Sequence, residues 1–218
     1  KKNRRKFDIK RANPIGTLMS LKRYPVISGL LICIVLFNIA QHATHSTWTF
    51  FTIEKFDWSE KLVGYSLGFI GLLAAIVQGG LIRVIIPKLG NINSVYFGMI
   101  FYILGLSLFA FAEEGWMVFA FAIPLSLGGI SGPALQGIMT NKIPDDEQGE
   151  FQGGMTSLVS LTAIIGPLLM TNLFSYFTSE NSFYYFPGAP FMVGAIISFF
   201  GLIIAVRFLS GSRGGSGI

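Results

Sequence analysis

The sequence predicts an all-α membrane protein with six transmembrane helices. Only 12% of its 218 residues are charged, 52% are hydrophobic, and the mean hydropathy is +0.62, whereas an ordinary soluble domain has about 25% charged residues. Six runs of 21 to 30 residues contain no Asp, Glu, Lys or Arg. Each run can cross a hydrocarbon core of about 30 Å once as a helix, but is too short to cross it twice. The runs do not alternate in polarity as the strands of a membrane barrel do, and the single cysteine excludes a disulfide scaffold.

These runs divide the chain into a basic linker, a membrane domain and a tail. Residues 1–23 contain nine of the sixteen Lys and Arg residues and are typical of a cytoplasmic linker within a longer chain. Residues 209–218 have the Gly- and Ser-rich composition of a flexible cytoplasmic tail. Residues 24–208 form the membrane domain between them. Its expected spans are residues 25–52, 61–83, 93–112, 115–141, 150–177 and 188–208.

The distribution of Lys and Arg predicts the orientation. Six spans place both termini on one side of the membrane, and fourteen of the sixteen basic residues then lie on that side. Cytoplasmic loops carry the excess of positive charge, so both termini are expected in the cytoplasm. The net charge of +5 is therefore interpreted as a topology signal and not as a surface for nucleic acid.

The first span carries polar side chains on one face. Asn38, Gln41, His42, His45 and Thr49 fall at offsets of 0, 3, 4, 7 and 11, the spacing of one helix face. Polar groups at membrane depth usually face a partner helix or a cavity, so this face is expected either to bond to other helices or to line a pathway. Histidine titrates near neutral pH, which makes proton handling a further hypothesis. A zinc site is less favoured because no carboxylate lies nearby in the sequence.

The second span is rich in glycine and carries Gln78 near its cytoplasmic end. This amide either bonds within the bundle or lines the pathway. The turn that follows contains Arg83 and Lys88, and the third span has few polar groups.

The fourth span contains Gly132, Pro133, Gln136 and Thr140 at helical spacing. Small residues allow helices to approach closely in lipid, and proline removes a backbone donor. We therefore expect either close packing or a bend beside a cavity, with Gln136 and Thr140 facing the pathway.

The fifth span repeats this pattern and the sixth is almost wholly apolar. Gln152, Thr156 and Ser160 share one face, and Gly166 and Pro167 signal a second bend. An acidic turn precedes the fifth span. Its carboxylates are expected to cap the helix N-terminus or to pair with the basic turn; the candidate cytoplasmic charge contacts are Arg83, Lys88, Asp145, Glu147 and Glu150.

Several strings together resemble one family. FTIEKFDWSEKLVGYSLGFIGLL, LGGISGPALQGIMT, EQGEFQGGMTSL and IIGPLL occur in this order. Together they resemble the C-terminal half, helices seven to twelve, of tetracycline-resistance-type drug:proton antiporters of the major facilitator superfamily. The resemblance implies two inverted three-helix units and a cavity lined by the first and fourth spans, supported by the second and fifth. It departs from the family's best-known class at Tyr102, where an acidic residue is expected, and at Ala74, where a histidine is expected.

The predicted function is proton-coupled efflux of a small amphipathic compound, such as tetracycline, by alternating access. All eleven Asp and Glu residues lie outside the six runs, so no carboxylate is expected at membrane depth. No phosphate loop, catalytic dyad or metal-ligand cluster is recognisable in the sequence. We therefore expect neither an enzyme nor a cofactor or metal. The expected partners are lipid, the substrate, the proton and a missing N-terminal six-helix half, in a bacterial inner membrane. Two alternatives stay open, a self-sufficient six-helix homodimer and a membrane scaffold without transport activity.

Overall fold

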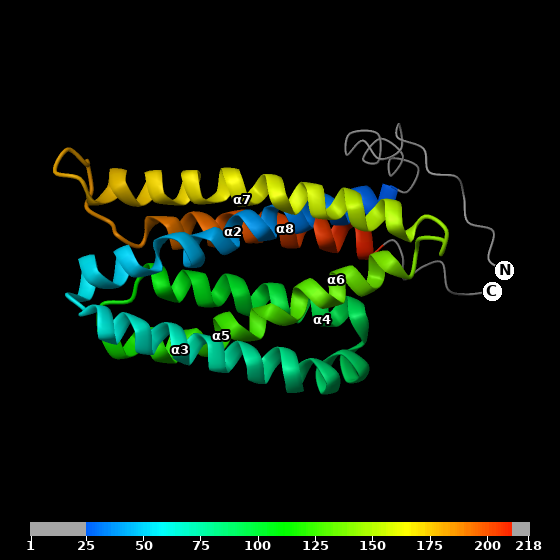
Figure 1. The fold of residues 1–218 in the computed structure, drawn as a ribbon, viewed down its shortest axis with the longest axis horizontal. Coiled ribbons are helices and arrows are strands. Elements are labelled where there is room, and N and C mark those ends of the chain that lie inside the picture. The colour runs from blue at the N-terminus through cyan, green and yellow to red at the C-terminus, as the bar shows by residue number, and fades with distance from the viewer. Residues whose placement is uncertain (1–24, 211–218) are drawn as a thin grey trace.

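The structure is a computed structural model that describes residues 25–210. These residues form helices that lie side by side along one common direction, with no strand among them (Figure 1). The expected linker, residues 1–23, and residues 211–218 of the expected tail lie outside the described residues. The elements are α2 (Pro25–Phe56), α3 (Glu60–Ile76), the π-helix η1 (Val77–Leu81), α4 (Ile82–Ala110), α5 (Gly115–Leu127), the 3₁₀-helix η2 (Gly128–Ile130), α6 (Ser131–Thr140), α7 (Gln148–Thr178) and α8 (Ala189–Ser210).

One helical stretch makes two crossings. Residues 60–110 are 51 residues of nearly continuous helix, far longer than a bilayer core of about 30 Å requires at about 1.5 Å per residue. Gly90 interrupts the stretch with φ 75° and ψ 161°, a combination essentially restricted to glycine. The chain reverses at this point and the rest of α4 runs back (Figure 1). With α2, α5–α6, α7 and α8, residues 25–210 make six crossings, as expected for an integral membrane protein of this fold class.

The last helix ends later than the sequence predicts. α8 continues to Ser210, whereas a flexible tail was expected from residue 209. Leu209 is fully buried and packs in the same cluster as Leu30 and Met139. Burial of this side chain favours a helical backbone through Ser210, beyond Arg207, the last charged residue of α8.

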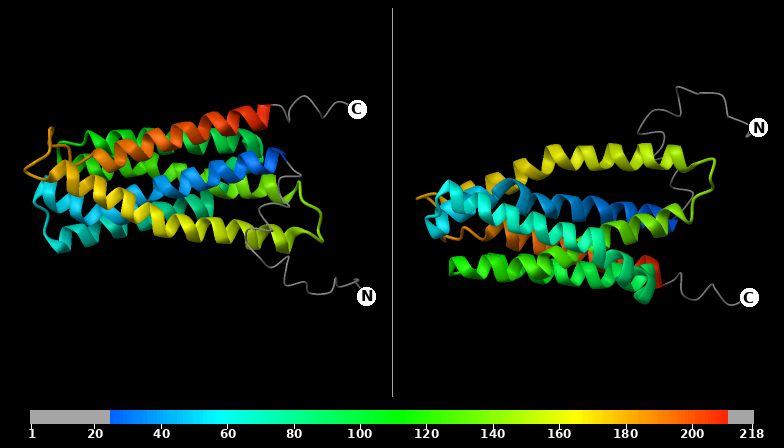
Figure 2. Two further views of the ribbon diagram at one scale, coloured as in Figure 1. Left: turned by 90° about the horizontal axis from the view of Figure 1, so that it is seen from above. Right: turned by 60° about the horizontal axis from the view of Figure 1, so that its bottom comes forward.

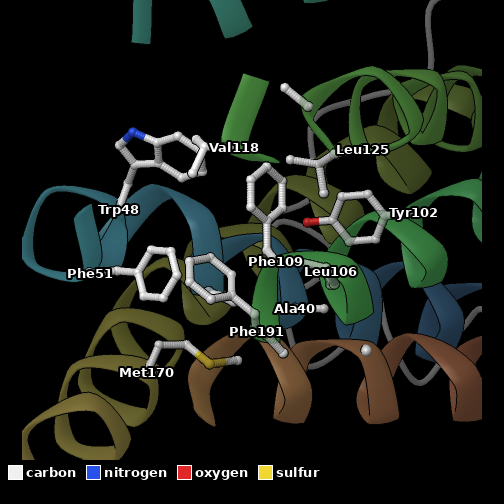
Figure 3. Close-up of a cluster of buried hydrophobic side chains, with 14 of the residues drawn as sticks. Ala40, Trp48, Phe51, Tyr102, Leu106, Phe109, Val118, Leu125, Met170 and Phe191 are labelled. Atoms are coloured by element: carbon white, nitrogen blue, oxygen red, sulfur yellow. The ribbon is translucent and has the colours of Figure 1, made fainter. Parts of the chain in front are cut away.

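The first three crossings interlock with the last three. α2 packs against α7 and α8, and α4 packs against α5, α6 and α8; Figure 2 shows α8 lying beside both α2 and α4. Large aromatic side chains fill one part of this interface. Trp48, Phe109 and Phe191 are almost fully buried there, with the rings of Trp48 and Phe109 edge to face at 5.2 Å (Figure 3).

Two crossings are much less buried than the others. Only 6% of the most apolar 18-residue window in Glu60–Ala110 and 17% of that in α7 is buried, against 44% to 50% in α2, α5–α6 and α8. Within Glu60–Ala110 the exposed part is α3, where only Val63 and Ser66 are buried, whereas α4 has nine buried residues. The exposed side chains include Leu72 and Ile76 on α3 and Ile164 and Leu168 on α7. Such apolar surface is stable against lipid or against another membrane-embedded protein surface.

Candidate functional site

A cavity of about 450 Å³ lies between α2, α3, η1, α4, α5 and η2. It adjoins residues 37–49, the middle of α2, and therefore lies near mid-depth in the bundle. Its volume is within the range of about 300–1,000 Å³ that is typical of small-molecule sites. None of the lining residues is an Asp, Glu, Lys or Arg. They are Phe37, Gln41, Thr44, His45, Trp48, Thr49, Leu67, Ile70, Ala74, Gln78, Tyr102, Leu125, Ser126 and Gly129.

α2 supplies both the mouth and the floor of this cavity. His45 and Thr49 are exposed at the mouth, whereas Thr44 is 8% exposed and Trp48 2% exposed at the floor. Spacings of three and four residues place Gln41 with Thr44, His45 and Trp48 on the same side of a helix. The side of α2 that faces the cavity therefore changes from polar at the mouth to aromatic at the floor.

The π-helix brings Gln78 to the cavity. Five residues, Val77–Leu81, adopt π-helical hydrogen bonding between α3 and α4, a rare local widening that occurs often at functional sites. A side-chain carbon added at Gly129 of η2 would lie 3.9 Å from Gln78 Nε2. The Gln78 amide therefore lies against the opposite wall, where Gly129 presents no side chain.

The opposite wall is shaped by Pro133 and by two glycines. Proline cannot donate to the carbonyl four residues earlier and its ring crowds that carbonyl. The helix accordingly passes through the 3₁₀ turn Gly128–Ile130 before α6 begins. A side-chain carbon at Gly128 would lie 2.6 Å from Tyr102 Cβ, so only glycine allows α4 to approach this closely.

Two contacts fix the aromatic side chains at the floor. Trp48 Nε1 donates a hydrogen bond to Ser66 Oγ at 3.0 Å, and Ser66 Oγ in turn donates to the carbonyl of Val63 at 2.7 Å. The rings of Phe37 and Tyr102 are 4.7 Å apart. Because Trp48 already uses its only donor, it can offer the cavity just its ring face.

Four of the eleven predicted pathway residues line this cavity, namely Gln41, His45, Thr49 and Gln78. His42 does not; its ring packs against Gly166 of α7, where any side chain would overlap it, and its Nδ1 lies 3.5 Å from Ser46 Oγ. Asn38 Nδ2 donates to the carbonyl of Ile34 at 2.9 Å.

The predicted residues on α6 and α7 lie elsewhere on the bundle. Gln136, Thr156 and Ser160 are exposed, whereas Thr140 and Gln152 are partly buried, and none of the five lines the cavity.

Only one of the two expected bends changes the helix type. η2 lies within one turn of Gly132 and Pro133, whereas α7 continues unbroken through Gly166 and Pro167. The neighbouring Thr171 Oγ1 donates to the carbonyl of Pro167 at 2.7 Å.

The residues that were predicted to make cytoplasmic charge contacts all lie at one end of the bundle. Figure 1 places the reversal in α4 and the turn between α6 and α7 at the same end, where α2 begins. Arg83 and Lys88 are exposed, and Asp145 Oδ1 accepts a hydrogen bond from Gln148 Nε2 at 3.3 Å. Glu147 immediately precedes α7 and Glu150 lies in its first turn.

Sequence reasoning missed the floor of the cavity. The polar residues that the sequence singles out do not include Thr44, Trp48 or Ser126, and Tyr102 stands out only as a departure from the family resemblance. The signal for the first two was present, because residues 41, 44, 45 and 48 share a helix face. Within residues 25–210, no three His, Cys, Asp or Glu side chains gather in a possible metal site.

Comparison with known proteins shows similarity to membrane transporters of one superfamily. The sequence model of the Major Facilitator Superfamily matches residues 1–167. Tetracycline resistance protein, class C, of Escherichia coli is 30% identical over 197 residues, which is 90% of this chain and 48% of that protein. Tetracycline resistance protein, class B, of Escherichia coli is 37% identical over 131 residues, 60% of this chain and 33% of that protein. Hippocampus abundant transcript-like protein 1 of Bos taurus is 26% identical over 94% of this chain and 44% of its own length. The chain thus spans at most about half the length of these relatives.

Proposed function

Because the chain belongs to the major facilitator superfamily, we propose that it is the C-terminal half of a secondary transporter that exports a small amphipathic compound such as tetracycline. The observation that carries the proposal is the cavity at mid-depth, where transporters of this kind bind their substrates. Its amide, imidazole and hydroxyl groups beside aromatic rings suit a compound with both apolar and polar parts. The similarity to two tetracycline resistance proteins supports the choice of tetracycline as the first compound to test.

An N-terminal six-helix half is the partner that this proposal requires. The chain spans 48% of the class C protein, and α3 and α7 leave most of their apolar surface uncovered. Rocking of this half against its partner would expose the cavity to each side of the membrane in turn. The 3₁₀ turn beside Gly132 and Pro133, and Gly166 and Pro167 on α7, are the proposed flexible points.

The remaining pathway residues belong to the surface between the two halves. Gln136, Thr156 and Ser160 are exposed polar groups on membrane-spanning helices, and such groups usually face water or a partner. We assign Asn38, His42, Thr140 and Gln152 to the same pathway as supporting residues, with lower solvent exposure.

Proton entry is the proposed driving force. No acidic residue lies in the uncharged runs of this chain, so we assign the coupling carboxylates to the N-terminal half. His45, exposed at the cavity mouth, is the candidate in this chain for sensing the proton. The excess of Lys and Arg near the chain ends supports cytoplasmic termini, an inner-membrane location and contacts between the basic and acidic cytoplasmic turns.

Cysteine accessibility in the full-length transporter tests the cavity assignment. The only cysteine of this chain, Cys33, is buried, so it contributes little background labelling. We expect tetracycline to slow the maleimide labelling of Gln41→Cys and Gln78→Cys. Asn181→Cys, exposed in the loop between α7 and α8, is the control and should label at an unchanged rate. Unchanged labelling at both cavity positions, in a protein that still effluxes the drug, would overturn the assignment.

A further inference from the structure

The cavity floor contains a hydroxyl group that the protein leaves unused. Thr44 is 8% exposed and lines the cavity, yet its Oγ1 has no hydrogen-bond partner of acceptable geometry within residues 25–210. The side-chain hydroxyl group of Tyr102 lies close to Thr44 Oγ1, but no hydrogen bond of acceptable geometry joins them. A buried polar atom without a partner is uncommon, because burial deprives it of water.

Several other buried hydroxyl groups in the same bundle behave differently. Ser198 Oγ and Tyr96 Oη, like Thr44 Oγ1, are buried without a hydrogen-bond partner within residues 25–210, but neither of these residues lines the cavity. Thr47 Oγ1 donates to the carbonyl of Ala43 and Thr52 Oγ1 donates to that of Trp48, one helical turn back. Ser131 and Thr162 make corresponding bonds with carbonyls three residues earlier. This local bond is the ordinary solution for a serine or threonine in an apolar helix. Thr44 does not use it, and it is the only one of these seven side chains that lines the cavity.

The surroundings of Thr44 are aromatic and rigid. Phe37 and Tyr102 pack against each other at 4.7 Å, and Trp48 is held by its bond to Ser66. Trp48, Tyr102 and Leu125 belong to one buried cluster (Figure 3). A flat ring that enters between these side chains would gain favourable ring contacts. Thr44 Oγ1 is itself closed to solvent, so a rotation of the Thr44 side chain would bring its hydroxyl group to a polar substituent on the leading edge of the ring.

From this arrangement we propose that the floor is a specificity subsite, in which Thr44 donates a hydrogen bond to an oxygen on an aromatic ring of the exported compound. The compound class is therefore an aromatic phenol or ketone. This inference rests on the proposed function and deepens it by assigning which part of the compound reaches the floor. Gln41, His45 and Gln78 near the mouth remain free to bind the other polar groups of the compound.

The test compares tetracycline binding by the full-length transporter and three variants. Thr44→Val removes only the hydroxyl group, Thr44→Ser keeps it, and Thr47→Val is the matched control on the same helix, outside the cavity. We expect Thr44→Val to weaken binding about three- to tenfold, the value of one neutral hydrogen bond. Thr44→Ser and Thr47→Val should bind within about twofold of the wild type, because neither change removes that hydrogen bond.

Thermal unfolding without drug separates a binding role from a structural one. Thr44→Val removes a buried group that has no partner, so it should unfold at the same temperature as the wild type or higher. Thr47→Val removes a bonded group from a well-packed position and should unfold at a lower temperature. Reduced binding together with undiminished stability is a result that a merely structural threonine would not give.

Each remaining outcome contradicts a specific statement. If the wild type binds tetracycline and Thr44→Val binds equally well, the subsite is wrong and the proposed function stands. If Thr44→Val loses both binding and stability, Thr44 is structural and the subsite is wrong. If the wild type does not bind tetracycline, the proposed substrate fails and the subsite falls with it.

Discussion

Trp48 has two roles: its ring lines the floor of the cavity, and its Nε1 donates a hydrogen bond to Ser66 on the neighbouring helix. Trp48→Phe removes that hydrogen bond and leaves space beside Phe109. We expect the free energy of unfolding to fall by about 1–3 kcal/mol, measured by equilibrium unfolding in mixed micelles. Trp116→Phe is the matched control, since Trp116 is 64% exposed and its change should stay within about 0.5 kcal/mol. Equal losses in both variants would contradict the assigned role of Trp48.

Gly166 is needed for the contact between α2 and α7. A methyl group there would overlap the His42 ring, so Gly166→Ala should cost about 1–3 kcal/mol of unfolding free energy through overpacking. Gly153→Ala lies on the same helix with nothing within 4 Å and should instead be stabilising by about 0.5–1 kcal/mol. Opposite signs in one assay are the expected result, and a neutral Gly166→Ala would show that His42 can move aside without cost.

At this scale the sequence predicts which residues are polar within the membrane, but not which of them share a site. The stripe of residues 38 to 49 is visible from spacing alone. Its division into Gln41 and His45 at the cavity and His42 against Gly166 depends on how α2 is rotated against α3 and α7. That rotation is set by tertiary packing, which periodicity in one helix does not contain.

Gly90 allows the chain to reverse between the second and third crossings. Its φ of 75° and ψ of 161° fall in a region that costs other residues about 1–3 kcal/mol. Gly90→Ala is therefore expected to lower the free energy of unfolding by that amount, again measured in mixed micelles. Gly64→Ala, in α3 with open space around it, should be neutral or stabilising. If Gly90→Ala were as stable as the wild type, the reversal would have to lie elsewhere.

The loop between α7 and α8 is tied to α2 by a hydrogen bond that depends on pH. Tyr185 Oη donates to Glu54 Oε1 at 2.8 Å. Partial burial, this hydrogen bond and the carboxylate charge all raise the pKa of Tyr185 above its ordinary value of about 10. The folded state thus favours the neutral phenol; this contribution is complete below about pH 10 and is lost as the pH rises through the higher folded value.

Tyrosinate absorbance measures this shift directly. The difference titration between the wild type and Tyr185→Phe should have its midpoint above pH 10. In a Glu54→Gln background the midpoint should move down towards 10, but not reach it, because partial burial remains as a cause. A midpoint unaffected by Glu54→Gln would mean that the hydrogen bond does not persist in solution.

The six crossings are predictable because each is a run without charge, and lipid tolerates little else. The departures from α-helical geometry within the crossings are harder to predict from the sequence. The 3₁₀ turn next to Pro133 is anticipated by the proline, whereas Pro167 leaves α7 unbroken and η1 forms without any proline. A proline in the sequence indicates where a backbone donor is missing. Whether the helix then changes its hydrogen-bonding type depends on its packing against neighbouring helices. The continuation of α8 to Ser210 is hard to predict for a similar reason, since the burial of Leu209 is a property of the packed bundle.

At the scale of the whole molecule, burial is distributed unevenly. α2, α4 and α8 form the packed centre, whereas α3 and α7 present apolar faces that nothing in residues 25–210 covers. This asymmetry, and the match to 48% of the class C protein and 33% of the class B protein, are the observations that support the proposed N-terminal half against these faces.

The last prediction concerns what this chain can do without that second domain. We expect the purified 23.8 kDa chain to have the mass of one copy in a mild membrane mimic and to show no proton-driven tetracycline transport in liposomes. The reason is that alternating access needs two bodies that rock about one site, and the uncharged runs of this chain supply no carboxylate to couple that motion to protons. Native mass spectrometry and a liposome flux assay measure the two expectations. A stable two-copy mass with transport would instead establish a homodimer, in which His42 and His45 would become the leading proton-handling residues. A two-copy mass without transport would leave the α3 and α7 faces as the contact surface and favour a scaffold.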